Sequence, residues 1–207
     1  PRLLVGSLGT LGVILSVALR VMPRAERECT LVREMSPAQA LTRMVRLGAE
    51  DLPLTGSCWH DGKLYLRLGG SKAQVQAART RLGGEEERAH RADFWDKLRD
   101  HGLIFFAEDA PLWRLIVPPA TPELTLPGAR LYEWHGRLRW LKTDLPAGRI
   151  RQRVAACGGH ATLFRGNPGD AEVFQPLSES LFALHRSIKR AFDPQCIFNP
   201  GRMYTDL

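Results

Sequence analysis

The amino-acid sequence predicts an α+β fold that contains a ferredoxin-like layer. Three consecutive segments carry this prediction: an amphipathic helix over 36–48, a β-hairpin over 54–68 and a second helix over 71–84. Helix, strand, strand and helix in this order form half of the ferredoxin-like pattern. The chain has 207 residues, 44% of them hydrophobic and 25% charged, so it can bury one good core or two small ones.

The N-terminal segment has no charged residue from Leu3 to Leu19, as in a signal peptide or a membrane-spanning helix. Glycines at every third position from Gly6 to Gly12 disfavour a helix, and apolar residues alternate over 13–21 with the period of a strand. We therefore expect a loop and then a strand with one buried face, rather than membrane insertion. Because the chain begins with Pro in an apolar stretch, we also expect a fragment of a longer protein.

Local signals define the elements of the ferredoxin-like pattern. Ser36 is placed to cap the first helix, with Pro37 at its first position and Gly48 at its end. The strands over 54–59 and 63–68 flank His60-Asp61-Gly62, a sequence typical of hairpin turns. The second helix begins after Ser71 and stops at Gly83-Gly84, since glycine accepts the left-handed conformation that ends a helix.

The rest of the chain reads as one α+β domain with a short piece at each end. Residues 23–28 are charged and predict a turn. The later predicted elements are helices over 92–100, 146–157 and 177–192 and strands over 112–117, 130–133, 137–141 and 160–165. This gives three parts: 1–23, the α+β domain over 24–195, and a C-terminal tail over 196–207.

Charge and cysteine content exclude several classes of function. The net charge is +7 and the pI is about 9.7, but no run of five basic residues occurs and no aromatic residues are spaced to stack bases. A generally basic surface, or one that matches an acidic subunit, is favoured over nucleic-acid binding. The four cysteines form no C-x-x-C pair, so we expect no zinc or iron–sulfur site. Because they are far apart in the sequence, we expect the protein to lie in a reducing compartment.

Two motifs at opposite ends of the chain are candidates for ligand contact. Gly6-Ser7-Leu8-Gly9-Thr10-Leu11-Gly12 would let the backbone approach a phosphate and would offer amide and hydroxyl donors, although a plain glycine-rich turn has the same pattern. Its spacing is neither that of a P-loop nor that of a Rossmann fingerprint. The segment from Phe198 to Tyr204 contains a rigid Pro-Gly turn followed by Arg202. Arg202 could pair with a pyrophosphate or stabilise a reduced flavin, or it could be an exposed cation on a packed tail.

Together these motifs resemble those of the vanillyl-alcohol-oxidase-type FAD-linked oxidases. The G-S-x-G-T-L-G segment with its alternating strand looks like the end of the PCMH-type FAD-binding domain of that superfamily, and the terminal F-N-P-G-R looks like its C-terminus. The intervening sequence resembles the FAD-binding subunits of bacterial glycolate oxidase at four motifs. These are Pro111–Arg114, Leu138–Leu141, Gly158–Arg165 and Ile188–Pro194.

The resemblance implies a flavin site and a set of partners. The residues that match cofactor contacts of the family are Gly6, Ser7, Gly9, Thr10, Leu11, Gly12, Val13, Asn199, Gly201 and Arg202. The implied complex is a glycolate (2-hydroxyacid) oxidase in which electrons pass through FAD to an iron–sulfur subunit and a quinone-type acceptor. The implied partners are a catalytic flavin subunit and that iron–sulfur subunit, in the cytoplasm or at the inner face of the membrane. Alternatives are a self-sufficient FAD-linked 2-hydroxyacid dehydrogenase and a non-enzymatic α+β interaction domain.

No catalytic residue can be assigned from the sequence. Related 2-hydroxyacid oxidases carry a G-D-G-N-x-H motif whose histidine lies near the substrate, and the chain has none. This favours an accessory flavin subunit, which as a fragment would be inactive. His160 could act as an acid or base, but a structural role is the more common one for a lone histidine. Trp113, Trp134 and Trp140 fit core packing or a subunit interface.

Overall fold

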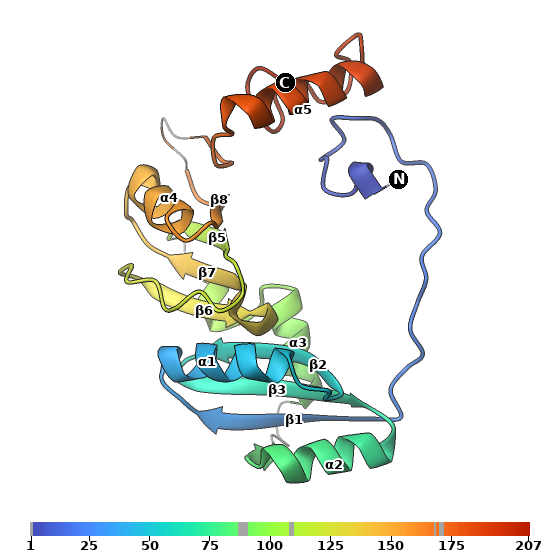
Figure 1. Cartoon of the computed structure of the whole chain (residues 1–207), viewed down its shortest axis with the longest axis vertical. Helices are drawn as coiled ribbons and strands as arrows, with labels where there is room; N and C mark the ends of the chain where they lie inside the picture. The colour runs from blue at the N-terminus through green and yellow to red at the C-terminus, as the bar shows by residue number, and fades with distance from the viewer. Residues whose placement is uncertain (1, 87–90, 108–109, 168, 170–171) are drawn as a thin grey trace. The chain divides into compact units, whose positions relative to one another are not determined.

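A computed structural model describes residues 2–86, 91–107, 110–167, 169 and 172–207, which fall into two compact units (Figure 1). We call residues 23–167 the sheet unit, and residues 1–22 together with 168–207 the terminal unit. The sequence-based division placed residues 24–195 in one domain. In the structure, residues from 168 onward cluster instead with the N-terminal segment.

The sheet unit contains one eight-stranded sheet with the order β4-β1-β3-β2-β6-β7-β5-β8, in which adjacent paired strands run antiparallel. Its strands are β1 (Arg27–Glu34), β2 (Leu54–His60), β3 (Lys63–Gly70), β4 (Glu85–Glu86), β5 (Leu112–Ile116), β6 (Ala129–Glu133), β7 (Leu138–Lys142) and β8 (His160–Arg165). Its helices are α1 (Pro37–Gly48), α2 (Lys72–Leu82), α3 (Arg91–Arg99) and α4 (Ala147–Ala155), with 3-10 turns η2 (Ile104–Phe106) and η3 (Trp134–Gly136). The predicted α+β class is confirmed.

Side-chain alternation assigns each face of the sheet to different helices. On β3, Leu64, Leu66 and Leu68 join the core that α1 and α2 cover, while Tyr65 packs with Phe94 of α3 on the other face. On β5, Trp113 and Leu115 pack with residues of α4, and Leu112 and Ile116 belong to the core that contains Leu98 of α3. Arg114 therefore shares the α3 face of the sheet.

The local signals in the sequence correctly located most elements. Ser36 and Ser71 each close a capping box with the Gln three residues later, and the hairpin turn at Asp61-Gly62 has positive φ at both positions. Strands β6 and β7 pair as the second predicted hairpin.

Strand β1 was missed, because residues 23–28 were interpreted as a charged turn. It begins at Arg27 and pairs with β3 along eight residues. Its central residues Cys29, Thr30 and Leu31 are all buried. Cys29 and Leu31 lie in the core under α1 and α2, while Thr30, on the α3 face, accepts a hydrogen bond from the Trp95 indole at 2.9 Å. A strand covered on both faces lacks the alternation that identifies a half-buried strand.

The predicted strand over 13–21 is wrong for this structure. Residues 12–24 have no regular secondary structure, and the side chains expected to be buried are exposed, with Leu15 at 91% and Val21 at 81%. A strand needs a neighbour for its backbone hydrogen bonds and a surface for its apolar face. No described strand pairs with this segment, so its alternating pattern has nothing to pack against.

The terminal unit contains the 3-10 turn η1 (Arg2–Leu4) and helix α5 (Glu179–Phe192). The predicted helix over 177–192 is confirmed, and Ser178 caps it by accepting from the Leu181 amide. None of the helices in the described ranges has both the length and the apolar character needed to cross a membrane.

Candidate functional site

The N-terminal loop of the terminal unit is shaped by its own hydroxyl groups. The Ser7 Oγ donates to the Leu4 carbonyl oxygen at 3.0 Å, and the Thr10 Oγ1 donates to the Ser7 carbonyl oxygen at 2.8 Å. Both side chains are buried. In this structure the hydrogens of both hydroxyls are already used inside the loop.

The backbone of the same loop does offer donors. Gly6, Leu8 and Gly9 have positive φ angles of 84°, 51° and 74°. Within the described residues, the amides of Leu8 and Gly9 have no backbone acceptor. Successive residues in unusual conformations of this kind can point amides toward a common anion. The loop therefore supplies amides rather than hydroxyls.

Lys189 of α5 joins the loop to the C-terminal tail. Its Nζ donates to the Thr10 carbonyl oxygen at 2.8 Å, to the Phe198 carbonyl oxygen at 2.7 Å and to Asp193 Oδ2 at 2.6 Å. The residue is only 4% exposed. An ammonium has three donors, and these contacts use all of them.

Asp193 completes this buried connection. Its carboxylate accepts from the Ile197 amide at 3.0 Å and from the Phe198 amide at 2.8 Å, in addition to Lys189. Burial raises the pKa of Asp193, but the hydrogen bonds from Lys189 and from the two amides outweigh burial, and the pKa lies below its ordinary value. The carboxylate is therefore ionised at neutral pH and fixes the turn that follows α5.

Sequence reasoning missed the role of Lys189 and Asp193. The signal was present as a Lys and an Asp four residues apart at the end of an amphipathic helix, a spacing that places both on one helical face. Such pairs are usually solvent-exposed, so spacing alone would not have shown that this one is buried.

The two ends of the chain meet directly at Gly9 and Asn199. The Asn199 Nδ2 donates to the Leu8 carbonyl oxygen at 2.9 Å. A Cβ atom on Gly9 would lie 2.8 Å from that Nδ2, so the absence of a side chain at Gly9 admits Asn199. Gly9 was expected to leave room for a ligand, but the room that it leaves is filled by the side chain of Asn199.

Beside this contact lies an open depression of about 690 Å³, lined by Leu8 and residues 199–202. Arg202 is exposed on it, and within the described residues its guanidinium has no ion pair or hydrogen bond. Gly201 has a φ of 70°, and its amide donates to the Leu207 carbonyl oxygen at 2.6 Å, which closes the tail into a compact turn. The uncommitted guanidinium of Arg202 on this depression is a donor that fits a phosphate group.

A second, smaller recess of about 180 Å³ lies in the same unit. Its wall is mostly apolar and includes Ile188 and Met203, with His185 and Lys189 from α5. Of the predicted cofactor contacts, Gly6, Ser7, Thr10 and Leu11 line this recess, while Asn199, Gly201 and Arg202 line the larger depression. Gly9, Gly12 and Val13 line neither, and Val13 is 70% exposed.

His160 lies at the exposed start of β8. Burial of part of the ring and the positive charge of Arg114 lower its pKa, so the ring is neutral at neutral pH. No group of three or more metal-binding side chains (His, Cys, Asp or Glu) is found within the described ranges.

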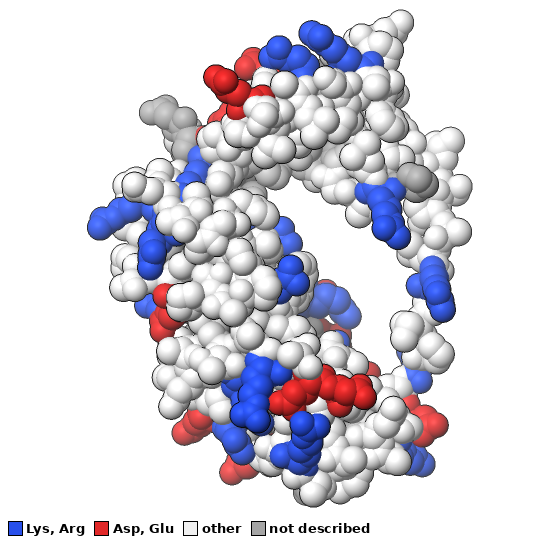
Figure 2. All heavy atoms as spheres, viewed as in Figure 1, with Lys and Arg blue, Asp and Glu red and all other residues white. Residues whose placement is uncertain are grey.

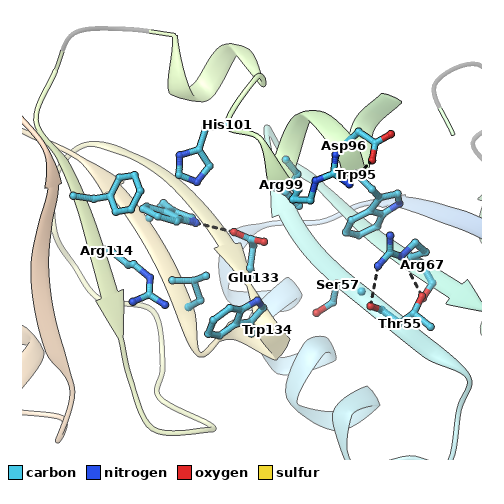
Figure 3. Close-up of a pocket in the computed structure, with 15 residues that line it drawn as sticks. Thr55, Ser57, Arg67, Trp95, Asp96, Arg99, His101, Arg114, Glu133 and Trp134 are labelled. Carbon is cyan, nitrogen blue, oxygen red and sulfur yellow. Dashed lines mark hydrogen bonds and ion pairs between the residues drawn. The ribbon is translucent and has the colours of Figure 1, made fainter. Parts of the chain in front are cut away.

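The sheet unit contains its own cavity of about 690 Å³ on the α3 face (Figure 3), which sequence reasoning did not identify. It combines Arg114, Glu133 and Trp140 from neighbouring strands and Trp134 of η3 with residues of α3. Trp134 and Trp140 were interpreted as core packing or an interface, because only the register of the sheet brings them together with Arg114 and Glu133.

Part of the terminal unit matches a known family model. Residues 170–203, which include α5, Lys189, Asp193 and most of the tail, match the family model of the FAD linked oxidases, C-terminal domain. This is the part of the chain whose residues contact the N-terminal loop.

A second comparison covers the whole chain. It is 41% identical over 206 residues to "Glycolate oxidase subunit GlcE" of Escherichia coli (strain K12). The alignment covers 100% of this chain and 57% of that protein, so the chain spans little more than half the length of this relative. The two comparisons together indicate FAD as the cofactor.

Proposed function

We propose that this chain is part of the FAD-binding subunit of a glycolate (2-hydroxyacid) oxidase complex. In that complex, electrons from the CH–OH group of the hydroxyacid would pass through the flavin to an iron–sulfur subunit and a quinone-type acceptor. The observation that carries the proposal is the 41% identity to the glycolate oxidase subunit along the whole chain. The FAD-oxidase match at the C-terminal end supports it.

The terminal unit would provide the flavin contacts of this chain. FAD, when bound, would accept the hydride of the substrate, which carries both electrons of the oxidation. Arg202 would pair with a phosphate or offset negative charge on the ring, and the amides of Leu8 and Gly9 would donate to phosphate oxygens. Lys189 would act indirectly, because it holds the loop and the tail together.

The proposed function gives each part of the chain a role. Residues 1–23 would complete an FAD-binding domain, the sheet unit would form a cap domain, and the tail over 196–207 would contact the flavin. The order β1-α1-β2-β3-α2-β4, with β4-β1-β3-β2 in the sheet, supports a ferredoxin-like arrangement for the first half of the cap. The exposed apolar residues over 13–22 would then pair with strands of the FAD-binding domain.

The proposed partners are a catalytic flavin subunit and an iron–sulfur subunit, in the cytoplasm or at the inner face of the membrane. Figure 2 shows basic side chains interspersed with acidic ones on the visible face, which suits charge-complementary contacts with a partner more than a nucleic-acid groove. Residues 1–207 alone would be inactive.

The visible absorption spectrum of the purified full-length protein tests the proposal. We expect a flavin band that bleaches when glycolate is added anaerobically to the assembled complex. A full-length protein without flavin absorbance would contradict the proposal and would favour a non-enzymatic interaction domain. Bleaching by the isolated subunit would favour a self-sufficient dehydrogenase.

A further inference from the structure

The cavity on the α3 face of the sheet unit has a floor of strands and a wall of α3 (Figure 3). Its floor comes from several strands, with Arg67 on β3, Arg114 on β5, Glu133 on β6 and Trp140 on β7. Its volume of about 690 Å³ lies in the middle of the range typical of small-molecule sites.

Two of the three guanidinium groups that line the cavity are committed to protein acceptors. Arg67 donates to the Thr55 hydroxyl at 3.1 Å and to the Thr55 carbonyl oxygen at 3.3 Å, and lies over the Trp95 ring. Arg99 forms ion pairs with Asp96 at 3.0 Å and with Asp100 at 2.8 Å. Arg67 therefore stabilises the floor of the cavity, and Arg99 stabilises its α3 wall.

Arg114 differs from both. Its guanidinium lies 5.6 Å from the centre of the Trp134 ring, and among the described residues it makes no ion pair or hydrogen bond. The carboxylate in this part of the cavity, Glu133, instead accepts a hydrogen bond from the Trp140 indole at 2.7 Å. The planar donor fork of Arg114 is therefore available for a carboxylate.

The surroundings of Arg114 are largely aromatic. Trp140 and Phe164 meet edge to face at 5.0 Å, and His101 packs against both. Trp134 is 56% exposed and Phe164 is 49% exposed, although both are large and apolar. Exposed aromatic side chains that line a recess are typical of ligand sites, because a bound apolar group would remove them from water.

We propose that this cavity binds an organic carboxylate that bears an apolar or aromatic substituent. Arg114 pairs with the carboxylate group, and Trp134, Trp140 and Phe164 contact the substituent. A two-carbon acid would leave most of the volume and most of the aromatic surface uncovered, so the cavity favours a larger acid over glycolate. The inference is independent of the proposed function, because it requires neither the flavin nor the terminal unit.

The test is titration of the full-length protein with 3-phenyllactate, glycolate and 3-phenylpropane-1,2-diol, followed by calorimetry and tryptophan fluorescence. We expect 3-phenyllactate to bind about tenfold or more tighter than glycolate, since the ring covers apolar surface. The diol, which has no carboxylate, should bind about tenfold or more weaker than 3-phenyllactate. Equal affinity for 3-phenyllactate and glycolate, or for 3-phenyllactate and the diol, would overturn the proposal.

A pair of variants locates the site. Arg114→Gln should weaken 3-phenyllactate binding about 10- to 100-fold, the range expected when a charge-assisted bidentate pair is lost. Arg149→Gln, on the exposed side of α4, should bind like the wild type. Equal losses in both variants, or none in Arg114→Gln, would overturn the assignment of Arg114. The wild-type comparison of the three ligands decides the proposal even if Arg114→Gln does not fold.

The same titration in the assembled complex distinguishes a free acid from a carboxylate side chain of a partner. Binding of 3-phenyllactate in the complex as in the isolated subunit supports a small-molecule site. Binding only in the isolated subunit would overturn it, because a partner would then occupy the cavity. Flavin content is measured in parallel, so that loss of FAD and loss of carboxylate binding are scored separately.

Discussion

The side chain of Asn199 donates a hydrogen bond to the carbonyl oxygen of Leu8, at 2.9 Å, across 191 positions of sequence. Together with Lys189, which reaches Thr10 and Phe198, this contact fixes the N-terminal loop against the C-terminal tail. The two motifs that the sequence singled out separately are therefore one local structure. Variants of its residues should affect flavin occupancy and local stability together.

Gly9→Ala should destabilise the terminal unit. Gly9 has a φ of 74°, and an added Cβ would lie 2.8 Å from Asn199 Nδ2, so Asn199 must move and lose its bond to Leu8. We expect a cost of about 1–3 kcal/mol and a lower flavin content, measured by thermal unfolding and by absorbance. Gly148→Ala is the control, since a Cβ there meets nothing within 4 Å. Similar losses in both variants would contradict the role of Gly9.

Lys189→Met should loosen the connection between loop and tail. The substitution leaves the Asp193 carboxylate and the carbonyl groups of Thr10 and Phe198 without their shared donor. We expect limited proteolysis within the terminal unit to become about tenfold faster or more. Arg190→Met, one residue further along α5 and exposed, should be cleaved at the wild-type rate. Unchanged cleavage of Lys189→Met would show that the buried pair does not hold the termini.

Arg202→Ala tests the proposed flavin contact without disturbing the fold. Arg202 is exposed and has no partner among the described residues, so thermal stability without flavin should change by no more than about 0.5 kcal/mol. Flavin affinity should fall about tenfold or more, the loss expected for one charge-assisted contact. Equilibrium dialysis with FAD measures it, with Arg186→Ala on α5 as the matched control. Full retention of FAD by Arg202→Ala would remove this residue from the site.

Glu133→Gln should stabilise the protein at neutral pH. Burial raises the pKa of Glu133, and the Trp140 hydrogen bond and the charge of Arg114 only partly offset burial. The folded state therefore binds the Glu133 proton more tightly than the unfolded state does. The stability that this proton adds is present at low pH and is lost as the pH rises through the pKa of the folded state. Gln is neutral and keeps an acceptor for the Trp140 indole.

Melting temperatures measured from pH 4 to pH 8 check this sign. The advantage of Glu133→Gln should grow as pH rises and should disappear near pH 4, about the unfolded pKa of a glutamate. Glu28→Gln, at an exposed position of β1, should show no such trend. An advantage that is constant with pH would mean that ionisation of Glu133 is not its cause.

The sequence by itself determined the local elements and the class of the fold. Ser36, Ser71 and the Asp61-Gly62 turn specify helix starts and a hairpin through contacts only a few residues apart, so they could be predicted without tertiary structure. The terminal motifs indicated the flavoprotein resemblance, which the comparisons support.

Tertiary structure decided what those motifs contact. The alternating apolar residues over 13–21 form a strand only where a neighbouring strand is present. Strand β1 has no alternating pattern, because both of its faces are covered. The burial of Lys189 and the position of Arg114 in a cavity depend on which distant segments pack beside them. Local sequence sets backbone preference, whereas burial and pairing are properties of contacts between residues far apart in the chain.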